Sequence, residues 1–205
     1  MRRADLILDG MISTPPEDWP FQLTICGIPE LGEHETAGVS HVLSILDPEI
    51  EDPAAFARFP SHSRLALRFH DIIDAEPGRV APTRPDVEQL LAFGEELNDR
   101  PGSHLLVHCH AGASRSTASA TLILLQACPD RPAVAALDAV VQTRPRAWPN
   151  LRILEYGDAL LGRNGELVAA AAAVYRRAVE RQPELAEIMI AAGRTREVAA
   201  ARQEP

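Results

Sequence analysis

The side chains best suited to carry out a reaction lie in one stretch, Leu105 to Leu124, which reads LLVHCHAGASRSTASATLIL. Cys109 ends a short apolar run, and Arg115 follows it by six positions. A thiolate is a nucleophile, and a guanidinium fork can hold two oxygens of a tetrahedral oxyanion. The hydroxyl of Ser116 can donate to the Cys109 sulfur when that sulfur is the leaving group. These residue types at this spacing predict phosphoryl transfer through a cysteine.

The pattern around these residues predicts a strand, a tight loop and a helix that position them. Leu105 to Val107 form the buried strand, Gly112 marks the loop, and Arg115 begins an apolar-periodic helix that ends near Ala127. Backbone N–H groups of the loop and the first helical turn lack internal partners, so they converge on an anion above the helix N-terminus. The same groups should favour the thiolate of Cys109. A side chain at Gly112 would meet the phosphate or need a costly positive φ.

The stretch resembles the signature His-Cys-x5-Arg-Ser of cysteine-dependent protein tyrosine and dual-specificity phosphatases, matched here by His108, Cys109, Gly112, Arg115 and Ser116. The resemblance implies that Cys109 attacks phosphorus, that Arg115 holds the transferred group, and that Ser116 assists departure of the thiolate. It also implies that His108 supports the loop without being a catalyst. The phosphate-binding loop is then His110, Ala111, Gly112, Ala113, Ser114 and Arg115. For His110, a plain solvent-exposed role is equally compatible with the sequence.

The resemblance also requires a general acid, an aspartate on a loop a few tens of residues before the cysteine. The segment Arg68 to Asp74 (RFHDIID) ends a predicted strand at the right distance. We assign the acid to Asp71, with Asp74 as the alternative. A loop aspartate is often only a turn former or helix cap, so the sequence leaves open that neither residue is the acid.

A zinc site and a structural cysteine are the other readings of this stretch. His108, Cys109 and His110 are three common zinc ligands in a row. Side chains alternate along an extended chain, so the two histidines point away from the cysteine and the three cannot share an ion. We therefore predict no metal and no other cofactor. A lone cysteine in a strand is ordinarily a buried structural residue, but the strand-loop-helix frame favours a nucleophile here.

The composition bears on partners and location. The 205 residues carry a net charge of −9 and no lysine, which argues against nucleic acid or an anionic membrane as a partner. We expect a phosphorylated protein or a small-molecule phosphate as substrate, with phosphate or sulfate able to occupy the site. No apolar stretch approaches the roughly 18 residues of a membrane span, and the cysteine number is odd, so we predict a cytoplasmic protein. The lysine-free, alanine-rich composition is typical of a GC-rich bacterial genome.

The two remaining cysteines, Cys26 and Cys128, lie in apolar surroundings. Small buried residues are the favoured interpretation for both, and a resolving thiol for Cys109 is the alternative.

The alternation of short strands and helices predicts an α/β fold. Expected strands are Asp5 to Leu8, Leu23 to Cys26, His41 to Leu46 and Arg64 to Phe69. Expected helices are one within Ile28 to Thr36, Asp52 to Phe59 capped by Asp52, one from Pro85, Pro132 to Thr143, Leu151 to Leu161, an Ala-rich helix beyond Gly165, and Glu184 to Ala192. The turn RPRAWPN, Arg144 to Asn150, also resembles the dual-specificity phosphatases, and Trp148 within it is interpreted as packing.

We therefore predict a small, mainly parallel central sheet flanked by helices, as in dual-specificity phosphatases. Residues 1–163 form the phosphatase domain, and residues 164–205 form a helical C-terminal extension packed on the same domain, with a flexible tail. The predicted function is cysteine-dependent phosphomonoester hydrolysis through a phosphocysteine intermediate, as in protein tyrosine or dual-specificity phosphatases. The alternatives are an inositol phosphate or phosphoinositide phosphatase and a non-catalytic phosphate-binding module.

Overall fold

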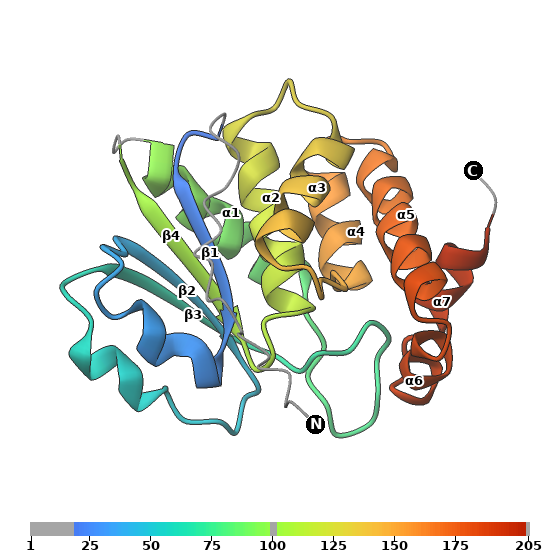
Figure 1. Ribbon diagram of the computed structural model, residues 1–205, viewed down its shortest axis with the longest axis horizontal. Coiled ribbons are helices and arrows are strands. Elements are labelled where there is room, and N and C mark those ends of the chain that lie inside the picture. Colours follow the sequence, from blue (N-terminus) through green and yellow to red (C-terminus); the bar gives the residue numbers. More distant parts are fainter. Residues whose placement is uncertain (1–18, 99–101, 204–205) are drawn as a thin grey trace, which may run out of the picture.

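A four-stranded parallel sheet organises the protein (Figure 1). The computed structural model describes residues 19–98 and 102–203. The strands, in spatial order, are β1 (Gln22–Gly27), β4 (His104–Cys109), β2 (His41–Leu46) and β3 (Ser63–Arg68). All neighbouring pairs are parallel, so the carboxyl ends of the strands lie along one edge. The predicted strand Asp5 to Leu8 and the end of the predicted flexible tail lie outside the described residues.

The two central strands are buried along their whole length. Every residue of β2 and β4 is buried, because helices cover both faces of the sheet, as parallel sheets require. Side chains therefore alternate between two cores. Leu105, Val107 and Cys109 belong to the larger core, whereas Leu106 of the same strand joins Cys26 in a smaller core on the opposite face.

Four helices cover the larger core: α1 (Arg84–Asn98), α2 (Arg115–Ala127), α3 (Ala133–Thr143) and α4 (Leu151–Leu160). The boundaries that were predicted for these helices agree with the structure to within one residue, and for α1 this is the start alone. Helix α2 continues directly from the loop after β4 and packs against that strand, so the loop is anchored at both ends by buried elements. The predicted framework of strand, loop and helix is therefore confirmed.

The smaller core is covered by short 3-10 helices, one inside the predicted range Ile28 to Thr36 and one shorter than the predicted helix Asp52 to Phe59. They are η1 (Ile28–His34) and η2 (Ala54–Arg58). The prediction that Asp52 caps a helix is wrong, because Pro53 is the first flanking residue of η2. The Asp52 carboxylate instead accepts hydrogen bonds from Arg64 (3.0 Å) and Arg68 (2.5 Å) of β3. These ion pairs hold the segment before η2 against the sheet edge.

The C-terminal residues form three helices, of which the first packs against α3 and α4 and the other two pack against the first (Figure 1). They are α5 (Glu166–Arg181), α6 (Leu185–Ala191) and α7 (Thr195–Arg202), and α7 lies where only a polar tail was expected. Tyr175 of α5 is fully buried, stacks on Trp148 at 4.8 Å and donates its hydroxyl proton to the Pro149 carbonyl. These helices share the larger core, and the domain boundary after residue 163 stays a prediction.

No helix within the described residues is both long and apolar enough to cross a bilayer.

Candidate active site

The loop between β4 and α2 is held by hydrogen bonds to its carbonyl oxygens. Each carbonyl from residue 110 to 114 accepts a bond from outside the loop. The donors are the N–H groups of Ile28, Trp148 and Asn150 and the guanidinium groups of Arg144 and Arg146, at 2.7 to 3.2 Å. Within the described part of the chain, the N–H groups of residues 111–114 donate no hydrogen bond. The loop therefore turns its carbonyls outward and leaves its donors for an anion.

Gly112 is required by the close approach of this loop to β1. Its φ is +69°, which favours glycine. A Cβ at this position would also lie 2.4 Å from the carbonyl carbon of Cys26. The positive φ agrees with the sequence prediction, and the Cys26 backbone is a further obstacle to a side chain at this position.

Cys109 ends β4, and its buried sulfur lies 3.3 Å from the Ser116 hydroxyl in the first turn of α2. Neither of the other two cysteines is placed to form a disulfide with Cys109. Cys26 faces the opposite core, and Cys128 follows the far end of the thirteen-residue helix α2, about 20 Å along its axis. This placement favours the interpretation of Cys26 and Cys128 as structural residues.

His108 points to the face opposite Cys109. Its Nε2 lies 2.7 Å from the Ser44 hydroxyl of β2, and its ring packs on Phe56 at 5.4 Å. Burial lowers the pKa of His108 to about 4, so the imidazole is neutral at physiological pH. The side chain thus ties β4 to β2 directly behind the cysteine, which fits a supporting position.

Arg115 is anchored by two oxygens at the carboxyl edge of the sheet. Its Nη1 donates to Asp47 Oδ1 and to the Phe69 carbonyl, both at 2.6 Å. Its Nε is buried and has no partner among the described residues. An unpaired buried donor is rare unless a ligand satisfies it. Asp47 was not predicted, although its place immediately after β2, on the edge where strand ends meet, was a usable signal.

His110 lies at the rim of the loop with 34% of its side chain exposed. Its Nε2 accepts a long hydrogen bond from the Asp47 N–H at 3.4 Å and lies 3.8 Å from the Asp47 carboxylate. The position is therefore intermediate between the two predicted roles, since the ring faces a neighbour of Arg115 yet remains partly in solvent.

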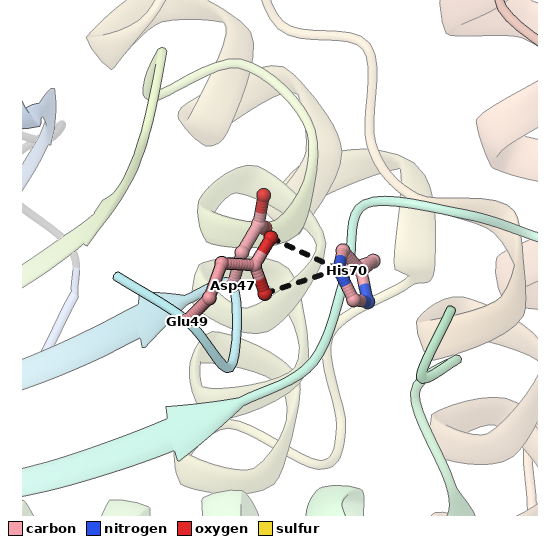
Figure 2. Close-up of side chains that lie close together, drawn as sticks. All are labelled: Asp47, Glu49 and His70. Atoms are coloured by element: carbon pink, nitrogen blue, oxygen red, sulfur yellow. Dashed lines mark hydrogen bonds and ion pairs between the residues drawn. The ribbon is translucent and has the colours of Figure 1, made fainter. Parts of the chain in front are cut away.

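Asp47 also belongs to a cluster with Glu49 and His70, drawn in Figure 2, whose potential metal-ligand atoms lie within 4.8 Å of one another. Each already has a partner in the protein. Asp47 bonds Arg115, and His70 Nδ1 accepts the Val80 N–H at 2.9 Å. The proton of this imidazole therefore lies on Nε2, which donates to Glu49 at 3.4 Å. These bonds account for the cluster without an ion.

Asp71 reaches the loop and Asp74 does not. Oδ1 of Asp71 accepts hydrogen bonds from Ser114 Oγ (2.8 Å), Asn150 Nδ2 (2.9 Å) and Arg194 Nη2 (2.5 Å). Burial by itself would raise the pKa of Asp71, but the charges of Arg194 and Arg115 and the two neutral donors hold it below its usual range. Asp74 is 57% exposed and pairs with Arg196 at 3.2 Å.

Arg194, between α6 and α7, is a site residue that the sequence did not indicate. It is almost fully buried, and its Nη2 bonds Ser114 Oγ (2.6 Å) as well as Asp71. Its Nη1 bonds Glu197 at 2.9 Å. Glu197 also accepts the indole N–H of Trp148, so this tryptophan both packs and donates. Burial raises the pKa of Glu197 to about 7, against the pull of Arg194 and these donors.

No family model matches the sequence, and neither does any curated protein. Solved structures do match. The human protein DUSP28 gives a TM-score of 0.52 at 22% identity, over 69% of this chain and 94% of that chain. Tk-PTP in its active form gives 0.51 at 21% identity, over 74% and 97%. A human tyrosine phosphatase-like serine/threonine/tyrosine-interacting protein gives 0.51 at 18% identity, over 71% and 93%.

At these identities the structural likeness establishes the fold. The four-stranded parallel sheet, the loop after β4 and the helices around them thus have the architecture of the dual-specificity and tyrosine phosphatases.

Proposed function

We propose that this protein is a cysteine-dependent phosphomonoester hydrolase of the protein tyrosine or dual-specificity type, working through a phosphocysteine intermediate. The observation that carries the proposal is the loop that follows Cys109. The carbonyls of residues 110–114 accept hydrogen bonds from outside the loop. Among the described residues, the N–H groups of residues 111–114 have no acceptor and the buried Nε of Arg115 has no partner. Such a set of unpaired donors next to a thiol suits a phosphoryl group.

In the proposed reaction, the Cys109 thiolate attacks phosphorus while the bond from phosphorus to the ester oxygen breaks. Asp71 gives its proton to that leaving oxygen. Water then attacks the phosphocysteine, Asp71 takes a proton from the water, and the thiolate leaves with help from the Ser116 hydroxyl, 3.3 Å away. Arg115 and the loop N–H groups hold the transferring oxygens in both steps.

Asp71 must be protonated to act as the acid, although its neighbours lower its pKa in the ligand-free site. A phosphoryl dianion bound beside Arg115 adds negative charge close to this carboxyl group, which raises its pKa. The dianion also competes for the hydrogen bonds that Ser114 and Arg194 donate. We infer that substrate binding itself produces the acid form.

The experiment is hydrolysis of p-nitrophenyl phosphate with and without a strong chelator, by the wild type and by Arg115→Lys. We expect turnover that the chelator leaves unchanged, and a large loss in the variant, because an ammonium group cannot reproduce the two hydrogen bonds of the guanidinium fork. Turnover that the chelator abolishes would assign the chemistry to a metal, for which the cluster of Asp47, Glu49 and His70 would be the first place to look.

The same purified protein can be used to test the two alternative functions. An inositol phosphate or phosphoinositide phosphatase commonly has lysines in this loop, and the chain contains none. A non-catalytic phosphate-binding module would bind vanadate without turning over any ester.

The described cysteines are all free, which fits the cytoplasmic location predicted from the sequence.

A further inference from the structure

The loop between β3 and α1, residues 69–83, contains the proposed general acid Asp71 and has neither helix nor strand of its own. In Figure 1 it leaves the sheet toward α6 and returns to α1. Backbone groups of such a long irregular loop have no helix or ladder partners, so other parts of the protein must bond them. Those partners determine where the loop lies, and hence where Asp71 lies.

The loop is closed at its base by two hydrogen bonds between His70 and Val80. The His70 N–H donates to the Val80 carbonyl at 2.8 Å, and the Val80 N–H donates back to Nδ1 of His70 at 2.9 Å. Most residues from Asp74 to Val80 are exposed, whereas Ile72 and Ile73 are buried. The segment that follows the acid is therefore the part of the loop that is fixed to the protein.

One side chain of α4 bonds both ends of this loop. Arg152 lies in the first turn of α4 and is partly buried. Its Nε donates to the Pro82 carbonyl at 2.7 Å, and its Nη1 donates to the Ile73 carbonyl at 3.3 Å. Its Nη2 donates to the hydroxyl of Tyr156, one helical turn further along, at 3.1 Å. All three guanidinium nitrogens thus have a partner, and two of these partners are carbonyls of the loop.

Arg152 acts on Asp71 through the backbone. The Asp71 carboxylate is bonded by three other side chains, Ser114, Asn150 and Arg194. Arg152 holds the carbonyl of Ile73, two residues after the acid. Consecutive Cα atoms are a fixed distance of about 3.8 Å apart, and Ile72 between the two residues is buried. A shift of Ile73 therefore moves Asp71 as well.

We propose that Arg152 is a positioning residue for the general acid, which joins Ile73 to Pro82 and so holds Asp71 in place before a substrate binds. The inference rests on the proposed function and adds a residue to the same site. A guanidinium suits this role, because it donates from three nitrogens in fixed directions, whereas the ammonium of lysine is a single point. A displacement of about 1 Å in a reacting group can reduce the rate about 10²-fold.

The test is a double-mutant cycle between Arg152 and Asp71, measured as kcat/KM on phosphotyrosine and on an activated ester, a difluorinated coumarin phosphate. Arg152→Met keeps the length of the side chain and removes its donors. It should slow phosphotyrosine hydrolysis about ten- to a hundredfold and the activated ester far less, because only the poor leaving group needs the acid. In the Asp71→Asn background it should cause no further loss on phosphotyrosine, since the group that it positions is already absent.

Arg163→Met is the matched control. Arg163 also donates to two loop carbonyls, those of Arg131 at 3.0 Å and Pro129 at 2.8 Å, but this loop follows the far end of α2. Both substitutions leave two carbonyls without their donor and should lower stability to a similar extent. Arg163→Met should nevertheless keep the wild-type ratio of the two ester rates.

Arg152→Lys is the second variant, because it keeps the charge and disturbs the fold less. It can bond one of the two carbonyls and should show the same selective loss on phosphotyrosine to a smaller extent. Equal slowing of both esters by the Arg152 variants, a full additional loss in Asp71→Asn, or the same change of ratio in Arg163→Met would each overturn the inference. Absence of p-nitrophenyl phosphate hydrolysis by the wild type refutes the proposed function, whereas its presence with additive losses refutes only the role of Arg152.

Discussion

Nη2 of Arg194 lies 2.5 Å from Oδ1 of Asp71, although the two residues are 123 positions apart. The same guanidinium also bonds Ser114 in the loop and Glu197 in α7. A residue that follows α6 is thus in direct contact with the proposed general acid. The C-terminal helices and the site therefore form one structural unit, and changes in these helices should be visible in the pH dependence of catalysis.

Replacing Arg194 should move the basic limb of the pH–rate profile to higher pH. Arg194 is a main cause of the lowered pKa of Asp71, so its removal raises that pKa and keeps the acid protonated at higher pH. The variant Arg194→Gln alone would leave Glu197 buried without its cation, which is destabilising. Arg194→Gln combined with Glu197→Gln removes both charges and is the preferred variant, with kcat/KM measured across pH.

Arg196→Gln is the control for that measurement. Arg196 is half-exposed, pairs with Asp74 and Glu155, and does not contact Asp71. Its profile should coincide with that of the wild type. If the double variant is folded and the basic limb of its pH–rate profile lies at the same pH as in the wild type, Arg194 does not control the pKa of Asp71.

The acid assignment predicts a dependence on the leaving group. Asp71→Asn should slow the hydrolysis of phosphotyrosine by about 10² to 10⁴ fold, because a poor leaving oxygen must be protonated as it departs. An activated ester, such as a difluorinated coumarin phosphate, needs little protonation and should be affected far less. Asp74→Asn should do little, since Asp74 faces solvent and Arg196. The reverse order between the two variants would place the acid at Asp74.

His108 should make the fold less stable as the solution becomes acidic. Burial lowers its pKa in the folded state to about 4, below the value of about 6.5 in an unfolded chain. The unfolded state therefore binds the proton more readily, and stability present above pH 6.5 is lost as the pH falls. Between pH 7 and pH 5 the loss from this group is roughly 2 kcal/mol.

Denaturant unfolding of the wild type and of His108→Gln over that range measures the effect. Glutamine can still bond the Ser44 hydroxyl but does not titrate, so the stability difference between the proteins should change with pH by about that amount. Parallel pH dependences for the two proteins would contradict the assignment of a neutral, buried His108.

The sequence predicted those parts of the site whose geometry is local. Cys109, Gly112, Arg115 and Ser116 lie within one strand, one loop and one helical turn, so their spacing alone places them together. Asp71 was assigned as the acid from the resemblance, because it follows a predicted strand at the expected distance before Cys109, and the structure places it within hydrogen-bond distance of Ser114. The periodic apolar patterns gave α1 to α4 nearly to the residue for the same reason.

Contacts between distant segments were not predictable in this way. Asp47 holds Arg115 across 68 positions, and its sequence context offered only a place after a strand. Arg194 and Glu197 lie in a stretch whose polarity suggested a tail, and only Val198 and Ala201 indicated a buried face there. Pairing a buried arginine with a buried glutamate requires knowledge of how α7 packs on α5, which no local pattern contains.

The most direct test of the account is detection of the covalent intermediate on Cys109. An activated aryl phosphate should be mixed with Asp71→Asn, in which water attack on the intermediate is slowed, and the denatured protein analysed by mass spectrometry. We predict one phosphoryl group on the peptide that contains Cys109, and neither phosphoryl group nor turnover in Cys109→Ser, which should still bind vanadate through the loop and Arg115. A phosphoryl group on another residue, or Cys109→Ser turning over near the wild-type rate, would contradict the mechanism.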